Sequence, residues 1–495
     1  MYPTGDRRAA GSGNKKRLAK SGSRSQDAVG RTYPDQADFA ERGDGCGFNN
    51  MADIIHDFLH YNRTMQANLA ERMENILPAD EWELLQRVAE TAGRLGLPLY
   101  AVGGLPRDLL LGSPGKDLDV VVEGPAEDLA RALAGRYGGR VVVHGRFGTA
   151  KWETPVPAGQ PTGGAQQNGA RRVLDLVTAR SEVYRQPGAL PSVTAGGIAD
   201  DLRRRDFTIN AIAIRLDGSH LGELRDDMGG RRDLEQGIVR VLHERSFIDD
   251  PTRMYRAVRY ESRYGFRMAD ETLALLPGGR EGVRKLSAQR IRHELDLILD
   301  EERAQAILRR LAELDLLRAI HASLSFGAGA ARRLAAAEQA PLLAIPALPR
   351  RGLRWLLWLM ELPAPEIASL QERLHFTSAL FKDLAGASRL LSQVDSLVGL
   401  PPSGWDEHLQ EAPPAAVYAV CLTLDPGPAR AALKSYLREW RHLRPRTTGH
   451  DLKDLGLEPG AQYRQILREL RRAWLDGEIR SEEDEQTYLR ALLNR

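Results

Sequence analysis

The sequence feature that most restricts the possible fold is a run in which an expected strand, a double glycine, a short helix and a second strand follow one another. Leu99 to Val102 reads as a strand that feeds Gly103-Gly104, and Arg107 to Leu111 has the composition of a short helix. Asp117 to Val122 is expected to be a strand, because it ends in a β-branched run just before a turn. This run predicts a small mixed sheet flanked by helices.

Two aspartates open the second of these strands. Residues two apart on a strand point to the same side, so Asp117 and Asp119 aim their carboxylates at one point. Such a pair repels itself unless a cation lies between the two charges, and Mg²⁺ is the usual one. Gly103 and Gly104 let backbone N–H groups approach a ligand, and Arg107 adds a positive fork that suits a phosphate. The pattern predicts phosphoryl or nucleotidyl transfer.

A third carboxylate, Asp175, lies on a later expected strand, Val173 to Thr178. If that strand pairs beside the aspartate-bearing one, Asp175 can bind a second metal or activate an attacking hydroxyl. The alternative is a salt-bridge partner at a strand edge. The sequence leaves both readings open.

An arginine-rich segment follows, with Arg203 to Arg205 directly before Asp206. The apolar run from Ile209 to Ile214 predicts that the helix carrying these arginines is anchored, so that one or two of them point toward the sheet. A buried arginine needs a carboxylate or a phosphate. Asp206 is the expected structural partner, and a triphosphate is the expected functional one.

A third segment begins with Asp250 and Pro251 and continues as a helix, since Pro251 suits a first helical turn. Its arginines recur every third residue and form one stripe; they are Arg253, Arg256 and Arg259. Asp250 can accept a hydrogen bond from an exocyclic amino group while Arg253 donates to ring acceptors, so the pair can read the edge of a base. Arg256 and Arg259 can hold phosphates. A solvated basic stripe is the alternative.

Composition sets wider limits. The chain has 495 residues, 42% hydrophobic and 27% charged, with a formal net charge of +2, so a nucleic-acid surface has to be a local patch. Its two cysteines, Cys46 and Cys421, lie far apart, which argues against a zinc site and a disulfide framework and predicts a reducing cytoplasm. No apolar stretch is long enough for a membrane span, and we expect no obligate protein partner.

Together, the three segments resemble the signature motifs of class II tRNA nucleotidyltransferases, the CCA-adding enzymes. Bacterial poly(A) polymerases belong to the same family, within the polymerase-β superfamily. The resemblance runs from about Leu84 to Phe266 and recurs weakly at Thr448 to Leu452 and at Pro459-Gly460. This chain has Asp249-Asp250-x-x-Arg253 where the family usually has Glu-Asp-x-x-Arg.

The resemblance implies a role for each matched residue. The ligands of two Mg²⁺ ions are Asp117 and Asp119. The residues at the triphosphate and the nucleotide are Gly103, Gly104, Arg107 and Arg205. The protein template for the base is formed by Asp250 and Arg253, and the residues at phosphate and ribose are Arg256 and Arg259. The segment 180–199 stands in the place of the flexible loop that helps CCA-adding members switch from C to A.

The fold expected from the pattern and the resemblance is α+β, with a small mixed β-sheet head followed by an extended all-α neck, body and tail. The expected regions are a disordered tail (1–51), an N-terminal helix (52–80), the catalytic head (81–215), a base-recognising neck (216–285) and a tRNA-binding body and tail (286–495). Further helices are expected over Asp80 to Leu95, Glu127 to Tyr137, 287–300, 304–318 and 462–475. Further strands are expected over Arg140 to His144 and Thr149 to Glu153.

The implied reaction is attack of an RNA 3′-hydroxyl on the α-phosphorus of CTP or ATP. The expected function is therefore template-independent addition of CMP and AMP to the 3′ end of tRNA. Family members that add only CC, add only A or polyadenylate RNA are open alternatives, and the intact segment 180–199 favours full CCA addition. The long helical half argues against a transferase acting on a small molecule or protein. The aspartate pair argues against a non-enzymatic RNA-binding protein.

Overall fold

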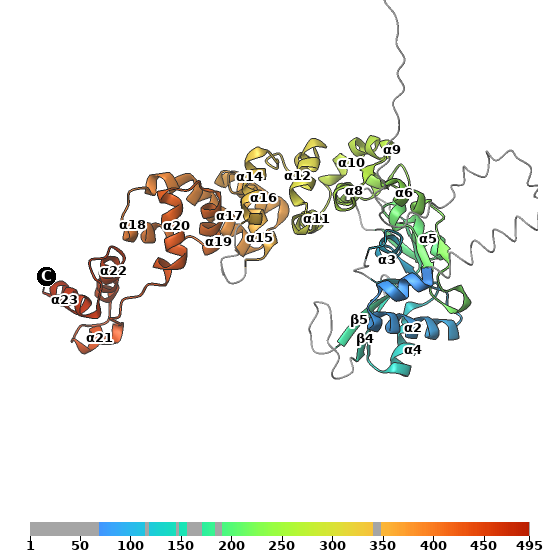
Figure 1. Cartoon of the computed structure of the whole chain (residues 1–495), viewed down its shortest axis with the longest axis horizontal. Helices are drawn as coiled ribbons and strands as arrows, with labels where there is room; N and C mark the ends of the chain where they lie inside the picture. Colours follow the sequence, from blue (N-terminus) through green and yellow to red (C-terminus); the bar gives the residue numbers. More distant parts are fainter. Residues whose placement is uncertain are drawn as a thin grey trace, which may run out of the picture. The chain divides into compact units, whose positions relative to one another are not determined.

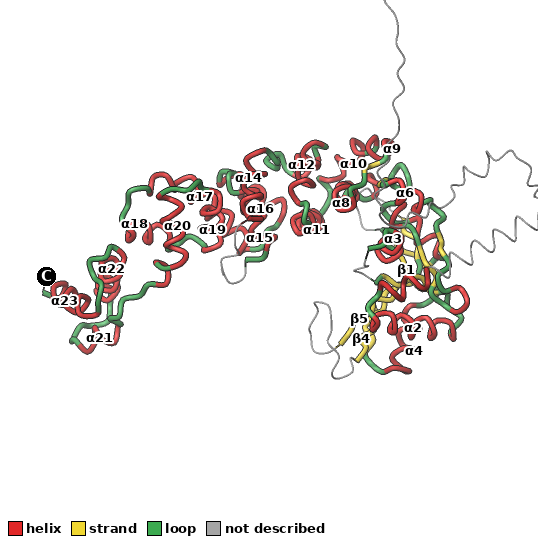
Figure 2. The backbone as a smooth tube through the Cα atoms, in the orientation of Figure 1, coloured by secondary structure: helices red, strands yellow, loops and turns green. Residues whose placement is uncertain are grey.

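The computed structural model describes residues 69–113, 118–144, 148–155, 171–183, 191–339 and 348–494. Strands gather in the N-terminal part of the described chain, and the rest is built of helices (Figures 1 and 2). The expected α+β class is thereby confirmed. The expected tail and most of the expected N-terminal helix lie outside the described residues, which begin with a helical stretch over 69–76.

A seven-stranded mixed sheet forms the head, in the order β3-β4-β5-β2-β1-β8-β9. β2 and β5 run parallel, and the other neighbouring strands run antiparallel. The strands are β1 (Leu99–Val102), β2 (Asp119–Val122), β3 (Arg140–His144), β4 (Thr149–Pro155), β5 (Arg171–Thr178), β8 (Ala213–Arg215) and β9 (Leu224–Arg225).

Two helices cover one face of this sheet. The apolar sides of α2 (Ala79–Arg94) and α4 (Ala126–Tyr137) belong to one buried cluster with Val120, Val122 and Leu176. Figure 2 shows both helices beside the strands. Alternate residues of a strand face opposite sides of the sheet, so Val120 and Val122 of β2 point toward α2 and α4.

The opposite face of the sheet carries the chemistry. α5 (Ile198–Arg203) packs against it, and Ile198 shares a buried cluster with Val121 and Ala213. Asp119 lies two residues before Val121 and therefore points to the same face. The fold thus separates an apolar face under α2 and α4 from a face that leads to the site.

The apolar run from Ile209 to Ile214 was expected to anchor a helix, and this expectation is wrong. The run forms a short 3-10 turn, η3 (Thr208–Asn210), and then enters β8, a strand inside the sheet. A short continuous apolar run fits a strand buried on both faces as well as it fits a helix. The helix α5 itself ends at Arg203, before the other arginines.

The segment 180–199 contains a two-stranded hairpin of β6 (Arg180–Val183) and β7 (Ser192–Ala195). Residues 184–190 between these strands lie outside the described residues. The hairpin precedes α5 directly, and α5 contacts β6.

Short elements after the sheet form a region that we call the neck. They are α6 (Gly230–Gln236), β10 (Ile238–Val239), α7 (Ser246–Asp249), α8 (Thr252–Tyr264), β11 (Arg267–Met268), α9 (Asp270–Ala274) and α10 (Leu276–Val283). Pro251 precedes the first residue of α8, as its fixed φ suits. The sheet strand β9 lies beyond residue 215, where the head was expected to end, and the domain boundaries remain predictions.

The remaining helices form a region that we call the body and tail. Its helices are α11 (Ala288–Asp300), α12 (Ala304–Glu313), α13 (Leu316–Ile320), α14 (Ala328–Gln339), α15 (Arg350–Leu359), α16 (Ala364–Leu374), α17 (Ser378–Gln393), α18 (Pro402–Leu409), α19 (Pro414–Thr423), α20 (Pro428–Arg438), α21 (Gly449–Asp454), α22 (Ala461–Leu475) and α23 (Glu482–Leu493). The expected helix over 304–318 is divided into α12 and α13, because Asp315 has φ of 56° and interrupts the helical backbone.

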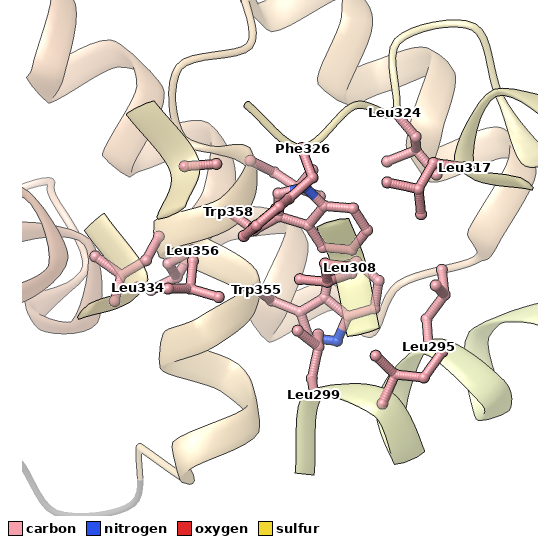
Figure 3. Close-up of a cluster of buried hydrophobic side chains, with 14 of the residues drawn as sticks. Leu295, Leu299, Leu308, Leu317, Leu324, Phe326, Leu334, Trp355, Leu356 and Trp358 are labelled. Atoms are coloured by element: carbon pink, nitrogen blue, oxygen red, sulfur yellow. The ribbon is translucent and has the colours of Figure 1, made fainter. Parts of the chain in front are cut away.

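Large side chains fill the core of the body (Figure 3). The rings of Trp355 and Trp358 stack with centroids 5.3 Å apart. Leu295 and Leu299 of α11 belong to the same buried cluster, so α11 is anchored in the body through its apolar side. None of the described helices is long and apolar enough to cross a membrane.

Candidate active site

A cavity of about 740 Å³ lies against the Val121 face of the sheet, and α8 supplies another of its walls. Most residues singled out from the sequence line this cavity. They are Gly103, Gly104, Arg107, Asp119, Arg205, Asp250, Arg253, Arg256 and Arg259. The fold therefore brings the three sequence segments to one place.

The carboxylate end of the cavity is built around Gly103. This residue has φ of 70°, and a Cβ added there would lie 2.9 Å from Arg205 Nη1 and 3.3 Å from Asp119 Oδ2. Glycine is therefore required both by the backbone and by the close approach of the two side chains. Asp119 pairs in register with Val102, the residue just before Gly103. The double glycine, the aspartate and Arg205 form one compact group.

The other two predicted carboxylates are placed differently. Asp117 lies outside the described residues. Asp175 lies on β5, beside β2, at the level of Asp119, because Leu176 is in register with Val120. Its carboxylate is half-exposed and pairs with Lys151 at 3.0 Å. This contact matches the strand-edge salt bridge, and a catalytic role for Asp175 remains a prediction.

A single buried carboxylate holds two of the three consecutive arginines. Asp201 has no exposed side-chain surface and accepts from Arg204 Nη2 at 2.6 Å and from Arg205 Nη2 at 3.0 Å. Arg204 also reaches Glu182 at 3.2 Å. The expected partner, Asp206, does not hold these arginines. Asp201 precedes them by three and four residues, which is the spacing at which helical side chains meet.

Asp206 instead pairs with the arginine stripe of α8. Its Oδ2 accepts from Arg256 Nε at 2.7 Å, and its Oδ1 accepts from Asn210 Nδ2 at 2.9 Å. Burial alone would raise the pKa of Asp206, but Arg256 and the Asn210 hydrogen bond outweigh it and lower this pKa to about 2. The charge of Asp206 in turn raises the pKa of Arg256. The pair joins head to neck as a fixed ion pair.

Arg107 is a buried part of the cavity wall. Its Nη1 donates to Asn210 Oδ1 at 2.7 Å, and its Nε donates to Asp108 at 2.8 Å. Its guanidinium carbon lies 4.9 Å from the centre of the Tyr264 ring, within cation–π range. These contacts fix Arg107 beside the glycines, and its contact with a triphosphate remains a prediction.

The base-reading pair predicted from the sequence lies in the same cavity. Asp250 Oδ1 accepts from the backbone N–H and the hydroxyl of Thr252, at 3.0 and 2.7 Å. Arg253 is 5% exposed, and it donates to Ser246 Oγ at 2.8 Å and to the carbonyl oxygen of Arg204 at 2.9 Å. These bonds use two of the five N–H groups of a guanidinium. Both side chains are therefore oriented before any ligand arrives.

Several site residues have no signal in the sequence. Asn210 bonds both to Arg107, 103 residues away in sequence, and to the nearby Asp206, and Arg290 reaches Asp250 from a helix of the body. Both contacts depend on the packing of distant elements. Asp201 is different, since its helical spacing to Arg204 and Arg205 was visible.

Two family models match the chain. Residues 99–240 match the poly A polymerase head domain, and residues 265–325 match the probable RNA and SrmB-binding site of polymerase A. An A-adding tRNA nucleotidyltransferase of Halalkalibacterium halodurans is 33% identical, and the match covers 86% of this chain and 96% of the relative. The chain belongs to the tRNA nucleotidyltransferase family. It is an enzyme of that family, as its motifs indicated.

Other relatives of this tRNA nucleotidyltransferase are named for the addition of different nucleotides. A CC-adding enzyme of Deinococcus radiodurans is 32% identical over 80% of this chain and 89% of its own length. A second A-adding enzyme, from Geobacter sulfurreducens, is 32% identical over 89% of this chain, which spans 50% of that relative. The solved Thermotoga maritima CCA-adding enzyme complexed with tRNA is 26% identical, with a TM-score of 0.68 over 86% of this chain and 98% of that one.

Proposed function

We propose that this tRNA nucleotidyltransferase adds CMP and AMP, taken from CTP and ATP, to the 3′ end of tRNA without a nucleic-acid template. One observation carries the proposal, namely that triphosphate features and a base-reading pair line the same cavity. The triphosphate features are Gly103, Gly104, Asp119 and Arg205, and the base-reading pair is Asp250 and Arg253. A site that reads a base with its own side chains needs no template strand.

In the proposed reaction, the 3′-oxygen of the RNA forms a bond to the α-phosphorus of the nucleotide. The bond between that phosphorus and the bridging oxygen breaks, and pyrophosphate leaves with the bonding electrons. The hydroxyl proton passes to water or to a nearby base. Asp175 would have to leave Lys151 to take that proton, whereas Arg205 already lies beside Gly103, where it can meet phosphate charge.

Mg²⁺ suits the donors at this end of the cavity. Asp119 provides carboxylate oxygen, the ligand type that Mg²⁺ prefers, beside a glycine backbone open to phosphates. Asp117, the second proposed ligand, lies outside the described residues. Two bound Mg²⁺ ions would lower the pKa of the attacking hydroxyl and neutralise charge on the leaving oxygens.

A second candidate is an enzyme that adds only the terminal A. The observation favouring it is that two relatives matched over most of this chain are named A-adding enzymes. An A-adding enzyme requires a tRNA that already ends in CC. A full CCA-adding enzyme accepts all three shortened ends.

Three tRNA transcripts, ending before the CCA, after C and after CC, separate these functions. Each is incubated with labelled CTP or ATP and Mg²⁺, and the products are resolved at single-nucleotide length. Full CCA addition predicts C incorporation into the first two ends and A incorporation into the third. A-only addition predicts incorporation of ATP into the CC end alone. A long A tail on any RNA would indicate polyadenylation, and no incorporation would overturn the proposal.

The body offers a second basic surface, which supports RNA binding there. A hollow of about 860 Å³ lies among α14, α19 and α20, and we call it the body hollow. Its basic residues without an ion pair in the described part of the chain are Arg332, Arg430, Lys434 and Arg438. Three of them recur every fourth residue of α20, where like charges repel. RNA phosphates would relieve this repulsion.

Two side chains of the helical half that are suited to RNA contact by type, Arg471 and Tyr436, pack inside the body and tail. Arg471 pairs with Asp406 at 2.7 Å, and Tyr436 is buried and donates to the carbonyl oxygen of Leu409. The exposed arginines Arg438, Arg444 and Arg472 are further candidates for tRNA contact. A cytoplasmic location and the lack of an obligate protein partner remain predictions.

A further inference from the structure

One helix of the body forms part of the active cavity. Leu297 of α11 lines the cavity, while Leu295 and Leu299 of the same helix lie in the body core (Figure 3). Asp296 also accepts a hydrogen bond from Trp355 Nε1 at 2.8 Å. Because α11 is fixed in the body on one side, whatever it holds on its cavity side is fixed too.

Arg290 of α11 holds the base-reading carboxylate. Its Nη2 donates to Asp250 Oδ1 at 2.6 Å, on the oxygen that already accepts from the backbone N–H and hydroxyl of Thr252. The Arg290 and Asp250 side chains are 28% and 19% exposed, so solvent screens this charge-assisted bond only in part. Three donors on one oxygen fix the direction in which the Asp250 carboxylate points.

Glu294, one turn further along α11, faces the arginine stripe. Its Oε2 lies 3.9 Å from Arg259 Nη2, beyond hydrogen-bond distance, and both side chains are under a tenth exposed. Glu294 Oε2 and Arg259 Nε have no hydrogen-bond partner among the described residues. Burial raises the pKa of Glu294 and lowers that of Arg259. Arg259 can therefore turn toward an anion without breaking a hydrogen bond to Glu294.

We propose that α11 sets nucleotide choice and nucleotide affinity through two positioning residues, Arg290 and Glu294. Arg290 aims Asp250 at the amino group of the base. Glu294 keeps the Arg259 guanidinium at the cavity wall, available to the phosphates or ribose of the nucleotide. This inference rests on the proposed function, and it adds that the body takes part in reading the nucleotide.

The two residues predict different kinetic changes. Without Arg290, the Asp250 carboxylate can rotate, so the enzyme discriminates less between correct and incorrect bases. Without the charge of Glu294, Arg259 loses its electrostatic partner, which affects all nucleotides because phosphate and ribose are common to them. Substitution of Arg290 should therefore change the ratio of kcat/KM between correct and incorrect nucleotides. Substitution of Glu294 should change the KM of all nucleotides to a similar extent.

The test compares Arg290→Met with Arg292→Met in the full-length protein. Arg292 lies on the same helix but donates to the backbone carbonyl of His375 and does not line the cavity in the described structure. Steady-state kcat and KM are measured for the correct nucleotide and for UTP and GTP on the same tRNA end. We expect Arg290→Met to reduce discrimination about tenfold, corresponding to the loss of one buried polar contact. Arg292→Met should leave discrimination unchanged.

Conservative variants separate positioning from simple destabilisation. Arg290→Lys keeps a cation near Asp250 and should recover part of the lost discrimination. Glu294→Gln keeps the shape of the side chain and should raise KM for CTP and ATP by a similar factor, about fivefold, with discrimination retained. Thermal unfolding checks that each variant is folded, and Glu294→Met replaces Glu294→Gln if the latter is not.

Two negative outcomes are distinct. If the wild-type enzyme adds no nucleotide to any tRNA end, the proposed function fails. If the wild type is active but Arg290→Met lowers kcat/KM equally for all nucleotides, or matches Arg292→Met, then the role of Arg290 is overturned. An unchanged KM for CTP and ATP in the folded Glu294 variant overturns the role of Glu294.

Discussion

The active cavity and the body hollow both gather arginines, but most of the arginines in the two places are held in opposite ways. In the cavity, Arg205, Arg253 and Arg256 are each bonded to a carboxylate, a hydroxyl or a carbonyl. In the described part of the body hollow, Arg430 and Arg438 have no ion pair. Partnered arginines keep one geometry, which suits the selection of one small ligand. Unpartnered cations adapt to a long anion, and salt screens their attraction.

Substitution of Asp119, the proposed metal ligand, should affect chemistry alone and give the largest effect. Asp119→Asn removes a negative charge beside Gly103, and we expect kcat to fall at least about 1,000-fold, because charge stabilisation at the reacting phosphate is lost. Binding of tRNA, measured by gel shift, should stay within about twofold. A comparable loss of tRNA binding would mean that the cavity and the hollow do not act separately.

The ion pair between Asp206 and Arg256 in the cavity should make the stability of the protein sensitive to acid. The pKa of Asp206 is about 2, below its ordinary value of 3.8, so its ion pair contributes stability above pH 4 and loses it as the pH falls toward 2. The loss should be about 2 kcal/mol. Urea unfolding between pH 5 and pH 2 measures it, and Asp206→Asn should lack this component. An identical pH dependence in both proteins would contradict a charged Asp206 in the folded state.

Discrimination between nucleotides should depend on the active cavity and not on the body hollow. Arg253→Ala removes the donors proposed to face the base and should reduce discrimination between nucleotides by about 10- to 30-fold, because polar groups of the correct base are left unpaired. The assay is single-nucleotide incorporation with each of the four triphosphates. Full rate with full selectivity in Arg253→Ala would rule out the template role.

The body hollow should contribute a smaller, salt-dependent effect. The triple variant Arg430→Gln, Lys434→Gln, Arg438→Gln should raise the KM for tRNA by about tenfold and flatten its dependence on salt, while kcat and the KM for ATP stay constant. A control with the same charge change replaces three ion-paired arginines of the head. These are Arg94, Arg131 and Arg136. Equal tRNA affinity in both triple variants would exclude the hollow from RNA binding.

Local patterns predicted much of the fold. The strand β1 and the helices α2 and α4 fall within one residue of their expected bounds, because a glycine or proline lies beside each of them and both helices have a clear period. The strand β8 was missed because its short apolar run carries no period. The hairpin of β6 and β7 was missed because its polar residues resemble a loop.

The candidate site was predictable where its residues are contiguous in sequence. Gly103, Arg205 and Arg253 stand in compact motifs, and the structure places them in one cavity. Their partners were less visible, since hydrogen bonds such as Arg290 to Asp250 link elements whose packing no local pattern encodes. Asp206 was assigned to the wrong arginines because adjacency in sequence suggested a pairing that the turn after α5 prevents.

The sharing of Asp201 has a consequence for how this enzyme can change. Arg205 lies beside Asp119, while the backbone carbonyl of Arg204 accepts from Arg253. A substitution at Asp201 would therefore disturb the phosphate end and the base end of the cavity together. Variant libraries meant to alter nucleotide preference should keep Asp201 constant and vary Arg290, where base selection can change while phosphate binding is preserved.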